Sequence, residues 1–302
     1  MYFRKRPRAT AIGTRPTGMV VLVTGAHGQL GQALQSIALQ YPAVQFQFCG
    51  SQEADLTNKT SLHEAFKKYK PTFCINAAAY TAVDKAESES DKAYAINAEG
   101  VRNLAEVCLK YQTVLLHVST DFVFDGSKKT PYTETDLPHP TGVYGASKLA
   151  GEQAVQEILS RFYIVRTAWV YSQFGANFMK TMLRLGSERD QLTVVDDQLG
   201  SPTLATDLAK TLVGICQQTA QNLTQAPYGI YHYSNEGSCS WCGFAQQILI
   251  NHHISTLVLP IPTSSFPTPA KRPAYSVLDK SKIKQAFGLE IASWQDALQT
   301  LD

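Results

Sequence analysis

A tyrosine and a lysine in the segment Tyr144-Gly-Ala-Ser-Lys148 have a spacing that suits proton transfer. Four positions apart on a helix, the phenol and the ammonium group lie on the same face. A free phenol, with a pKa of about 10, exchanges protons poorly at neutral pH, and a nearby cation favours its charged form. We therefore predict that Tyr144 transfers a proton with Lys148 as its partner. Lys148 can also hold the ribose of a nicotinamide cofactor.

The sequence Ser119-Thr120-Asp121 can place a hydroxyl group beside that phenol. It closes the apolar run 114–118, which predicts a buried strand. A hydroxyl at that point can hydrogen-bond a substrate carbonyl, although Ser-Thr-Asp alone is more typical of a capped strand exit. Because a dinucleotide loop precedes it and the Tyr/Lys pair follows it, we predict that Thr120, Tyr144 and Lys148 are the catalytic residues.

Three glycines, Gly25, Gly28 and Gly31, follow the apolar run 20–23 and open a segment whose apolar residues recur at helical spacing. This strand–turn–helix context is the one that a dinucleotide fingerprint requires. Glycine lets backbone N–H groups approach a pyrophosphate, and the helix N-terminus adds partial positive charge. The spacing Gly-x2-Gly-x2-Gly departs from Gly-x-Gly-x2-Gly, and a glycine-rich turn without a ligand is the alternative. We predict that this loop binds a dinucleotide.

The residues after the second predicted strand bear on the choice between NADPH and NADH. A carboxylate there binds a ribose 2′-hydroxyl and repels a 2′-phosphate. The sequence reads Cys49-Gly50-Ser51-Gln52, and the first carboxylate is Glu53. Because Ser51 can hydrogen-bond a phosphate, we predict NADPH, with NADH left open by Glu53. Asp55 is expected in a loop near the adenine.

Strand and helix patterns alternate along the first part of the chain, which predicts an α/β fold with a Rossmann-like doubly wound parallel sheet. The predicted strands are 20–23, 44–48, 73–79, 114–119 and 163–170. Beyond Tyr171, helical stretches alternate with Pro-rich loops. We expect a dinucleotide-binding domain over 19–170. Residues 171–302 are expected to form mainly a smaller C-terminal substrate-binding lobe, from which some segments return to the first domain.

The composition, with 44% hydrophobic and 17% charged residues, is that of a globular protein. Five basic residues lie in 1–18, a leader that we expect to lie outside the fold because Met19 directly precedes the first strand. Without them the net charge of +2 becomes negative. We therefore expect no nucleic-acid partner. No run of about 18 apolar residues is present, so no membrane partner or spanning helix is expected either.

Cys239 and Cys242 have the spacing of a redox pair or of half a zinc site. No second Cys/His pair with ligand spacing accompanies them, which favours a structural role. Reduced thiols suit the cytoplasm, which is the predicted location.

Taken together, the motifs resemble those of the dTDP-4-dehydrorhamnose reductase family, from about residue 19 to the end of the chain. The long central and C-terminal motifs are specific to this family, unlike the glycine loop. The matching segments are 24–31 (TGAHGQLG), 76–87 (NAAAYTAVDKAE), 119–124 (STDFVF), 144–152 (YGASKLAGE), 166–171 (RTAWVY), 177–182 (NFMKTM), 197–203 (DQLGSPT) and 267–273 (PTPAKRP). The resemblance implies NAD(P)H-dependent reduction of the 4-keto group of dTDP-4-dehydro-L-rhamnose to dTDP-L-rhamnose, for bacterial surface polysaccharide.

The resemblance also implies roles for individual residues. Tyr144 would donate the proton, Trp169 would shape the sugar pocket, and Arg272 would contact the diphosphate through bidentate bonds. The expected substrate-binding residues are Thr120, Asp121, Trp169 and Arg272. The expected cofactor-binding residues are Gly25, Gly28, Gln29, Leu30, Gly31, Asp55, Leu56, Ala79, Tyr80, Thr81, Val118, Tyr144 and Lys148.

Several alternatives remain open. The chain could be a reductase or epimerase of another nucleotide-linked keto sugar, and an epimerase would keep its NAD tightly bound. One branch of the family is a non-catalytic subunit of methionine adenosyltransferase, but here Thr120, Tyr144 and Lys148 are all present. Some members bind Mg²⁺ at a carboxylate-lined dimer interface. No glutamate accompanies the glycine loop here, so we predict no metal and leave a homodimer open.

Overall fold

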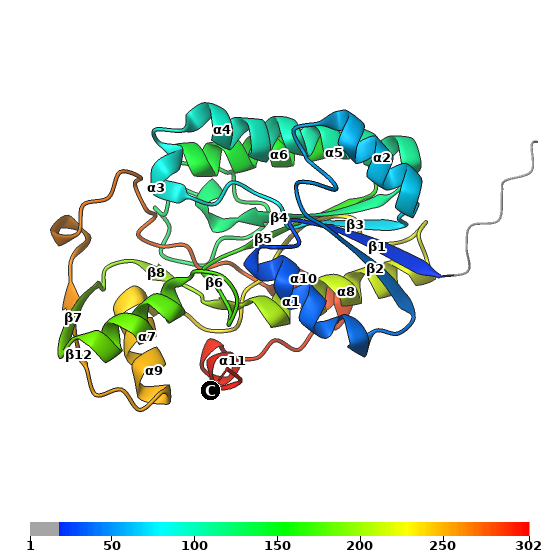
Figure 1. Cartoon of the computed structure of the whole chain (residues 1–302). Helices are drawn as coiled ribbons and strands as arrows, with labels where there is room; N and C mark the ends of the chain where they lie inside the picture. Colours follow the sequence, from blue (N-terminus) through cyan, green and yellow to red (C-terminus); the bar gives the residue numbers. More distant parts are fainter. Residues whose placement is uncertain (1–17, 302) are drawn as a thin grey trace, which may run out of the picture.

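The computed structural model describes residues 18–301, so all but the last residue of the basic leader lies outside it. Six parallel strands form the central sheet, in the order β10-β5-β4-β3-β1-β2 (Figure 1). The strands are β1 (Met19–Thr24), β2 (Val44–Cys49), β3 (Phe73–Asn76), β4 (Val114–Thr120), β5 (Phe162–Thr167) and β10 (Gly229–His232). Strand β2 lies on one side of β1, and the chain then crosses to β3 on the other side of β1. The strand order therefore reverses between β1 and β3, and ligands of such sheets bind at this switch point. The predicted fold class is confirmed.

Helices cover both faces of this sheet (Figure 1). The helices on one face are α2 (Lys59–Tyr69), α5 (Gly100–Tyr111) and α6 (Val143–Ile158). Those on the other are α1 (Gln29–Ile37), α8 (Ala205–Gln221) and α10 (Ser281–Phe287). The sheet strands consist largely of buried apolar residues, as strands covered on both faces must. One continuous core therefore lies on each side of the sheet.

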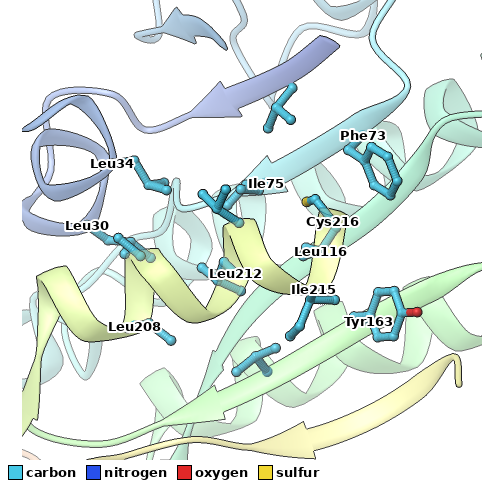
Figure 2. Packing of buried hydrophobic residues seen from close by; sticks show 14 of the residues in the cluster. Leu30, Leu34, Phe73, Ile75, Leu116, Tyr163, Leu208, Leu212, Ile215 and Cys216 are labelled. Atoms are coloured by element: carbon cyan, nitrogen blue, oxygen red, sulfur yellow. The ribbon is translucent and has the colours of Figure 1, made fainter. Parts of the chain in front are cut away.

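The core beneath the switch point joins segments that are far apart in the sequence. Leu30 and Leu34 of α1 pack with Leu208 and Leu212 of α8 over Ile75 of β3 (Figure 2). The two leucines on each helix are four positions apart, so each helix turns one apolar stripe toward the sheet. This packing fixes the N-terminus of α1 relative to the carboxyl ends of β1 and β3.

The second part of the chain forms a lobe beside the carboxyl ends of the sheet strands (Figure 1). Its elements are β6 (Val170–Tyr171), α7 (Phe178–Glu188), β7 (Gln191–Val195), β8 (Leu199–Gly200), β9 (Thr203–Leu204), β11 (Cys239–Ser240), α9 (Trp241–Asn251), β12 (Leu257–Ile261) and α11 (Trp294–Gln299). Strand β7 pairs with β12 in parallel. Phe244, Leu249 and Trp294 belong to a separate core cluster. The lobe is thus packed around its own apolar interior.

Three segments from this part of the chain contribute to the Rossmann layers. Helix α8 packs on α1, β10 pairs with β5, and α10 packs on β10. The sequence pattern did not identify β10 as a strand. At four residues, it is too short to show a clear period.

Two predicted strands end earlier in the structure than expected, and the strand expected over 73–79 ends at Asn76. The strand expected over 163–170 ends at Thr167, and Trp169 then adopts a left-handed backbone with φ of 46°. Residues 90–111 form α4 (Ser90–Tyr94), a π-helical turn (Ala95–Glu99) and α5. Short helices also occur at Ala38–Gln40, Val83–Ala86 (α3), Asp121–Val123 and Thr263–Ser265. No helix within 18–301 is long and apolar enough to cross a membrane.

Candidate active site

The glycine loop between β1 and α1 closely approaches two other stretches of backbone. Gly25 has φ of 70°, and a Cβ atom there would lie 2.5 Å from the backbone nitrogen of Ala78. A Cβ atom on Gly31 would lie 2.3 Å from the carbonyl oxygen of Gly25. Gly28 is exposed and caps α1 without a side-chain hydrogen bond to the helix. The first amide groups of α1 are therefore left for an anionic ligand.

Two adjoining cavities extend from this loop and contain most of the predicted residues. The first, of ≈ 310 Å³, is lined by Gly25, Gly28, Asp55, Leu56 and Ala79. The second, of ≈ 580 Å³, is lined by Gly28, Gln29, Leu30, Ala79, Thr81, Val118, Thr120, Asp121, Tyr144, Lys148 and Trp169. Gly28 and Ala79 line both, so the two cavities form one cleft over the switch point.

Two predicted cofactor residues, Gly31 and Tyr80, line neither cavity. Gly31 packs against the glycine loop and lines neither cavity. Tyr80 also lines neither, and its hydroxyl donates to Oε2 of Glu89 at 3.0 Å. The side chain of Leu30 belongs to the core, and only the edge of this residue reaches the cleft. Gly31 and Tyr80 therefore support the cleft through packing and hydrogen bonding.

Thr120 and Tyr144 come together at the centre of the larger cavity. Burial raises the pKa of the Tyr144 phenol to about 12, and the neighbouring Thr120 hydroxyl offsets only part of this effect. We expected Lys148 to move the phenol toward neutral pH, and in the structure burial dominates instead. Tyr144 is consequently neutral at physiological pH. A neutral phenol is the form that can donate a proton to a substrate oxygen.

Lys148 is buried one helical turn from Tyr144. Its Nζ atom donates to the carbonyl oxygen of Val118 at 2.8 Å and lies 3.5 Å from Nε2 of His117. Burial lowers the pKa of Lys148 to about 8, and the charge of Glu152 partly offsets this effect. Glu152 is itself paired with Arg166, whose guanidinium lies 2.7 Å from its carboxylate.

Asp121 carries a buried oxygen that the protein leaves without a partner. The side chain is 2% exposed, and its Oδ1 atom accepts from the Thr120 hydroxyl at 3.0 Å. Its Oδ2 atom has no hydrogen bond of standard geometry. Burial raises the pKa of this carboxyl to about 6, and the nearby Ser276 and Thr120 hydroxyls offset part of that effect. Since the residue lines the catalytic cavity, the free oxygen is available to a ligand hydroxyl.

Trp169 connects the catalytic cavity with the lobe. Its indole stacks on that of Trp241, with ring centroids 3.5 Å apart and planes 8° from parallel. A Cβ atom on Gly200 would lie 2.4 Å from the Trp169 ring, so only glycine fits there. These contacts hold a bulky residue in the left-handed region, where strain is typical of functional sites.

A third cavity, of ≈ 590 Å³, lies in the lobe, and Trp241 forms part of its wall. Phe178, Met182, Leu192 and Phe266 give it a largely apolar lining. Arg272 also lines this cavity rather than the catalytic one. Trp169 lines the larger cavity of the cleft and Trp241 lines the lobe cavity, so the stacked indoles lie between the two.

Arg272 is held by an acidic partner from the other domain. Its guanidinium forms two hydrogen bonds with the carboxylate of Asp84 in α3, at 3.0 and 2.8 Å. This contact lowers the pKa of the Asp84 carboxyl. The pair fixes the Pro-rich loop at the entrance to the lobe cavity.

Known proteins resemble this chain along nearly its whole length. The family model described as the RmlD substrate binding domain matches residues 19–301. The dTDP-4-dehydrorhamnose reductase of Aggregatibacter actinomycetemcomitans is 43% identical over 93% of this chain and 97% of its own. The enzyme of the same name from Escherichia coli K12 is 37% identical over 92% and 95%. The chain belongs to the dTDP-4-dehydrorhamnose reductase family.

Solved structures of family members agree with this assignment. A dTDP-4-dehydrorhamnose reductase from Bacillus anthracis, in complex with NADP, is 39% identical and superimposes with a TM-score of 0.89, covering 94% of this chain and 99% of its own. A UDP-glucose 4-epimerase from Thermus thermophilus, complexed with NAD, is 19% identical, with a TM-score of 0.77 over 94% and 97%. This second likeness concerns the fold alone.

In this family member, Gln29 connects the glycine loop to the lobe. Its Oε1 atom accepts from the Ser172 hydroxyl at 2.9 Å and from Nδ2 of Asn177 at 3.0 Å. Its Nε2 atom donates to the carbonyl oxygen of Val170. The side-chain amide is thus engaged within the protein, and the backbone N–H is the group of Gln29 left for a pyrophosphate.

Several residues that shape this reductase-family site were not predicted from the sequence. His117 contacts Lys148, His27 lines both cofactor cavities, and Trp241 stacks on Trp169. His27 could have been found, because it stands inside the glycine motif. Trp241 is 72 positions from Trp169. Only the packing of the lobe reveals that contact.

The cysteines and acidic residues show no arrangement for metal binding. Cys239 and Cys242 are free, and burial raises the pKa of the Cys239 thiol to about 12. A raised thiol pKa disfavours the reactive thiolate. Across residues 18–301, no group of three or more His, Cys, Asp or Glu side chains could hold a metal ion.

Proposed function

We propose that this chain reduces the 4-keto group of dTDP-4-dehydro-L-rhamnose to give dTDP-L-rhamnose. Relatives of that name are 43% and 37% identical over almost the whole chain. The observation that carries the proposal is the convergence of Thr120, Tyr144 and Lys148 in a cavity that adjoins the glycine loop. A regulatory subunit would not need this set.

The cleft fits a nicotinamide dinucleotide. The uncapped N-terminus of α1 would receive the pyrophosphate, and Lys148 would hold the nicotinamide ribose. Asp55 and Leu56 line the opposite end of the cleft, where the adenine would lie. Bound NADPH supplies the hydride that reduces the carbonyl carbon. The NADP complex of the B. anthracis relative supports NADPH as the cofactor.

The protein's own contribution is to deliver a proton to the carbonyl oxygen. Thr120 would orient that oxygen through a hydrogen bond, and Tyr144 would donate the phenolic proton to it. The high pKa of Tyr144 keeps the proton in place until negative charge develops on the oxygen. Lys148, as an ammonium group, would then stabilise the phenolate that remains.

The rest of the substrate would extend from the catalytic cavity into the lobe. Asp121 would accept a sugar hydroxyl with its free Oδ2 atom, and Trp169 would form an apolar wall for the deoxysugar. The thymidine would occupy the lobe cavity beside Phe178 and Trp241. Arg272, at the edge of that cavity, would contact the diphosphate. A cytoplasmic location, which the reduced thiols suit, and a homodimer, which some family members form, are further proposals.

Steady-state assays test the reaction directly. The purified protein is incubated with dTDP-4-dehydro-L-rhamnose generated in situ, and oxidation of NADPH and of NADH is recorded while the sugar product is identified. We expect one dTDP-L-rhamnose for each NADPH consumed. Sugar conversion without net cofactor oxidation would identify an epimerase. Absence of any conversion with either cofactor would overturn the proposal.

A further inference from the structure

His27 lies where the glycine loop meets the end of β2. The loop residue Ala26 donates its N–H to the carbonyl oxygen of Cys49 at 3.2 Å. An ideal Cβ atom on Gly50 would lie 2.7 Å from Nε2 of His27 and 2.8 Å from its Cδ2 atom. The imidazole therefore packs directly over Gly50, beside Ser51. In this fold the end of the second strand is where the adenosine ribose is recognised.

The smaller of the two cleft cavities, lined by Asp55 and Leu56, is called the adenine-side cavity below. Among its described lining residues, only His27 can supply positive charge. Among the described residues that line it, His27 is the only basic side chain, and Asp55 is the only acidic one. The remaining lining residues are Gly25, Gly28, Gly50, Ser51, Ala54, Leu56, Thr57, Ala77, Ala78, Ala79 and Ile96. A phosphate monoester carries a charge of about −1.5 to −2 at neutral pH. Ser51 can offer such a group a hydrogen bond but no positive charge.

We propose that His27 binds the 2′-phosphate of NADPH and favours this cofactor over NADH. This inference rests on the proposed use of a nicotinamide cofactor in this cleft. Imidazoles in general change charge between about pH 5 and pH 8, unlike the arginine that usually accompanies a 2′-phosphate. The preference for NADPH is therefore measured on both sides of the middle of that range.

The charged groups around His27 support this preference. Oε2 of Glu53 accepts from the backbone N–H of Gly50 at 2.9 Å, and it would lie 3.2 Å from a Cβ atom on Gly50. Lys68 of α2 acts electrostatically on Glu53 from the neighbouring helix. A protonated His27 offsets Glu53 and attracts the phosphate. With His27 neutral, Glu53 and Asp55 repel the phosphate, and a ribose 2′-hydroxyl is better tolerated.

Binding measurements test the role of His27 without turnover. Calorimetry gives the Kd values of NADPH, NADH, 2′,5′-ADP and 5′-AMP at about pH 6 and about pH 8, on either side of the middle of the histidine range. We expect the wild type to favour 2′,5′-ADP over 5′-AMP more strongly at the lower pH. His27→Asn should reduce that preference at the lower pH by roughly 10- to 100-fold, the value of one charge-assisted hydrogen bond. His27→Lys should keep the preference at both values.

Two controls separate His27 from other effects. The 2′-phosphate itself titrates near pH 6, and this contribution stays in the His27→Asn variant. His253→Asn is the matched histidine control, because His253 is exposed on the lobe and its φ of 55° suits asparagine. It should behave as the wild type. A His27→Asn variant with the wild-type preference and the wild-type pH response would overturn the proposal.

Failure of this inference is distinguishable from failure of the proposed function. Turnover of the dTDP-sugar together with equal binding of 2′,5′-ADP and 5′-AMP at both pH values would remove the role of His27 and leave the reductase. Discrimination that depends on His27, without turnover of the sugar, would support the phosphate site and contradict the assigned substrate.

Discussion

Nε2 of His117 in β4 lies 3.5 Å from the Nζ atom of Lys148 in α6, and both side chains are buried. The other nitrogen of the ring, Nδ1, lies 2.9 Å from Nδ2 of Asn76. The backbone N–H of Ala78 donates to one side-chain atom of Asn76, and this atom must therefore be the amide oxygen. The other atom, Nδ2, is then a hydrogen-bond donor. Nδ1 of His117 must therefore accept. A neutral His117 then carries its proton on Nε2, toward Lys148.

This tautomer predicts how activity depends on pH. Burial also lowers the pKa of His117 well below its usual value, so the ring stays neutral. Its Nε2–H faces the ammonium of Lys148 and disfavours the charged form. Because the pKa of Lys148 is lowered to about 8, we expect kcat/KM to fall as pH rises through that value. His117→Gln can turn an amide oxygen toward Nζ and should move this alkaline limb to higher pH.

The measurement is the pH profile of kcat/KM for the wild type and the His117→Gln variant, with thermal unfolding as a check on folding. Gln156→Glu, on the outer part of the same helix as Lys148, is the matched control and should leave the limb in place. An unchanged limb in a folded His117→Gln variant would show that His117 does not act on Lys148.

Tyr144→Phe tests the proton donor. Loss of general acid catalysis should lower kcat by about 10²- to 10⁴-fold. The Kd of NADPH should change little, because the phenyl ring keeps the packing against Phe122, whose ring lies 5.6 Å away. Single-turnover rates and cofactor titration measure the two effects separately. Near wild-type turnover in the Tyr144→Phe variant would exclude Tyr144 from the mechanism.

Arg272→Ala tests contact with the substrate diphosphate. We expect the KM for the dTDP-sugar to rise by the equivalent of about 1.5–3 kcal/mol, the value of a charged hydrogen bond. The KM for NADPH should hardly change, because Arg272 lines the lobe cavity and not the cofactor cleft. Arg184→Ala is the matched control, since Arg184 is exposed on α7 and pairs with Glu188. A rise confined to the NADPH KM would show that the loop is misplaced in our proposal.

Gln29→Ala tests the connection between the glycine loop and the lobe. The variant loses hydrogen bonds to Ser172 and Asn177, each worth about 0.5–1.5 kcal/mol. We expect a lower Tm and higher KM values for both cofactor and sugar. Gln246→Ala, which loses a longer bond of 3.3 Å within the lobe, provides the comparison. Equal effects of the two variants on both KM values would argue against a special role for Gln29.

Ser51→Asp tests the end of β2. Ser51 lines the adenine-side cavity, so a carboxylate there would face a 2′-phosphate. We expect a weaker kcat/KM with NADPH and a smaller change with NADH. Both values are obtained from initial rates with the sugar held constant. A wild-type protein that prefers NADH about tenfold or more would show that Ser51 and His27 do not favour the phosphate.

The sequence by itself determined the parts of this protein that are local in the chain. The apolar runs and helical spacing predicted the first five sheet strands, and the glycine motif predicted the turn between β1 and α1. The Tyr144/Lys148 spacing predicted a shared helix face. These predictions succeed because backbone periodicity and turn chemistry depend on neighbouring residues. The long motifs supplied the family.

Only the tertiary structure decided which distant groups meet and how each group is charged. It joined Asp84 to Arg272, Gln29 to Asn177 and Trp169 to Trp241. It also raised the pKa of Tyr144, where the lysine spacing alone suggested a lower one. Desolvation depends on everything packed around a side chain, and most of those atoms come from remote parts of the chain. The spacing of two residues therefore predicted a candidate catalytic pair, and the surrounding fold sets the protonation of that pair.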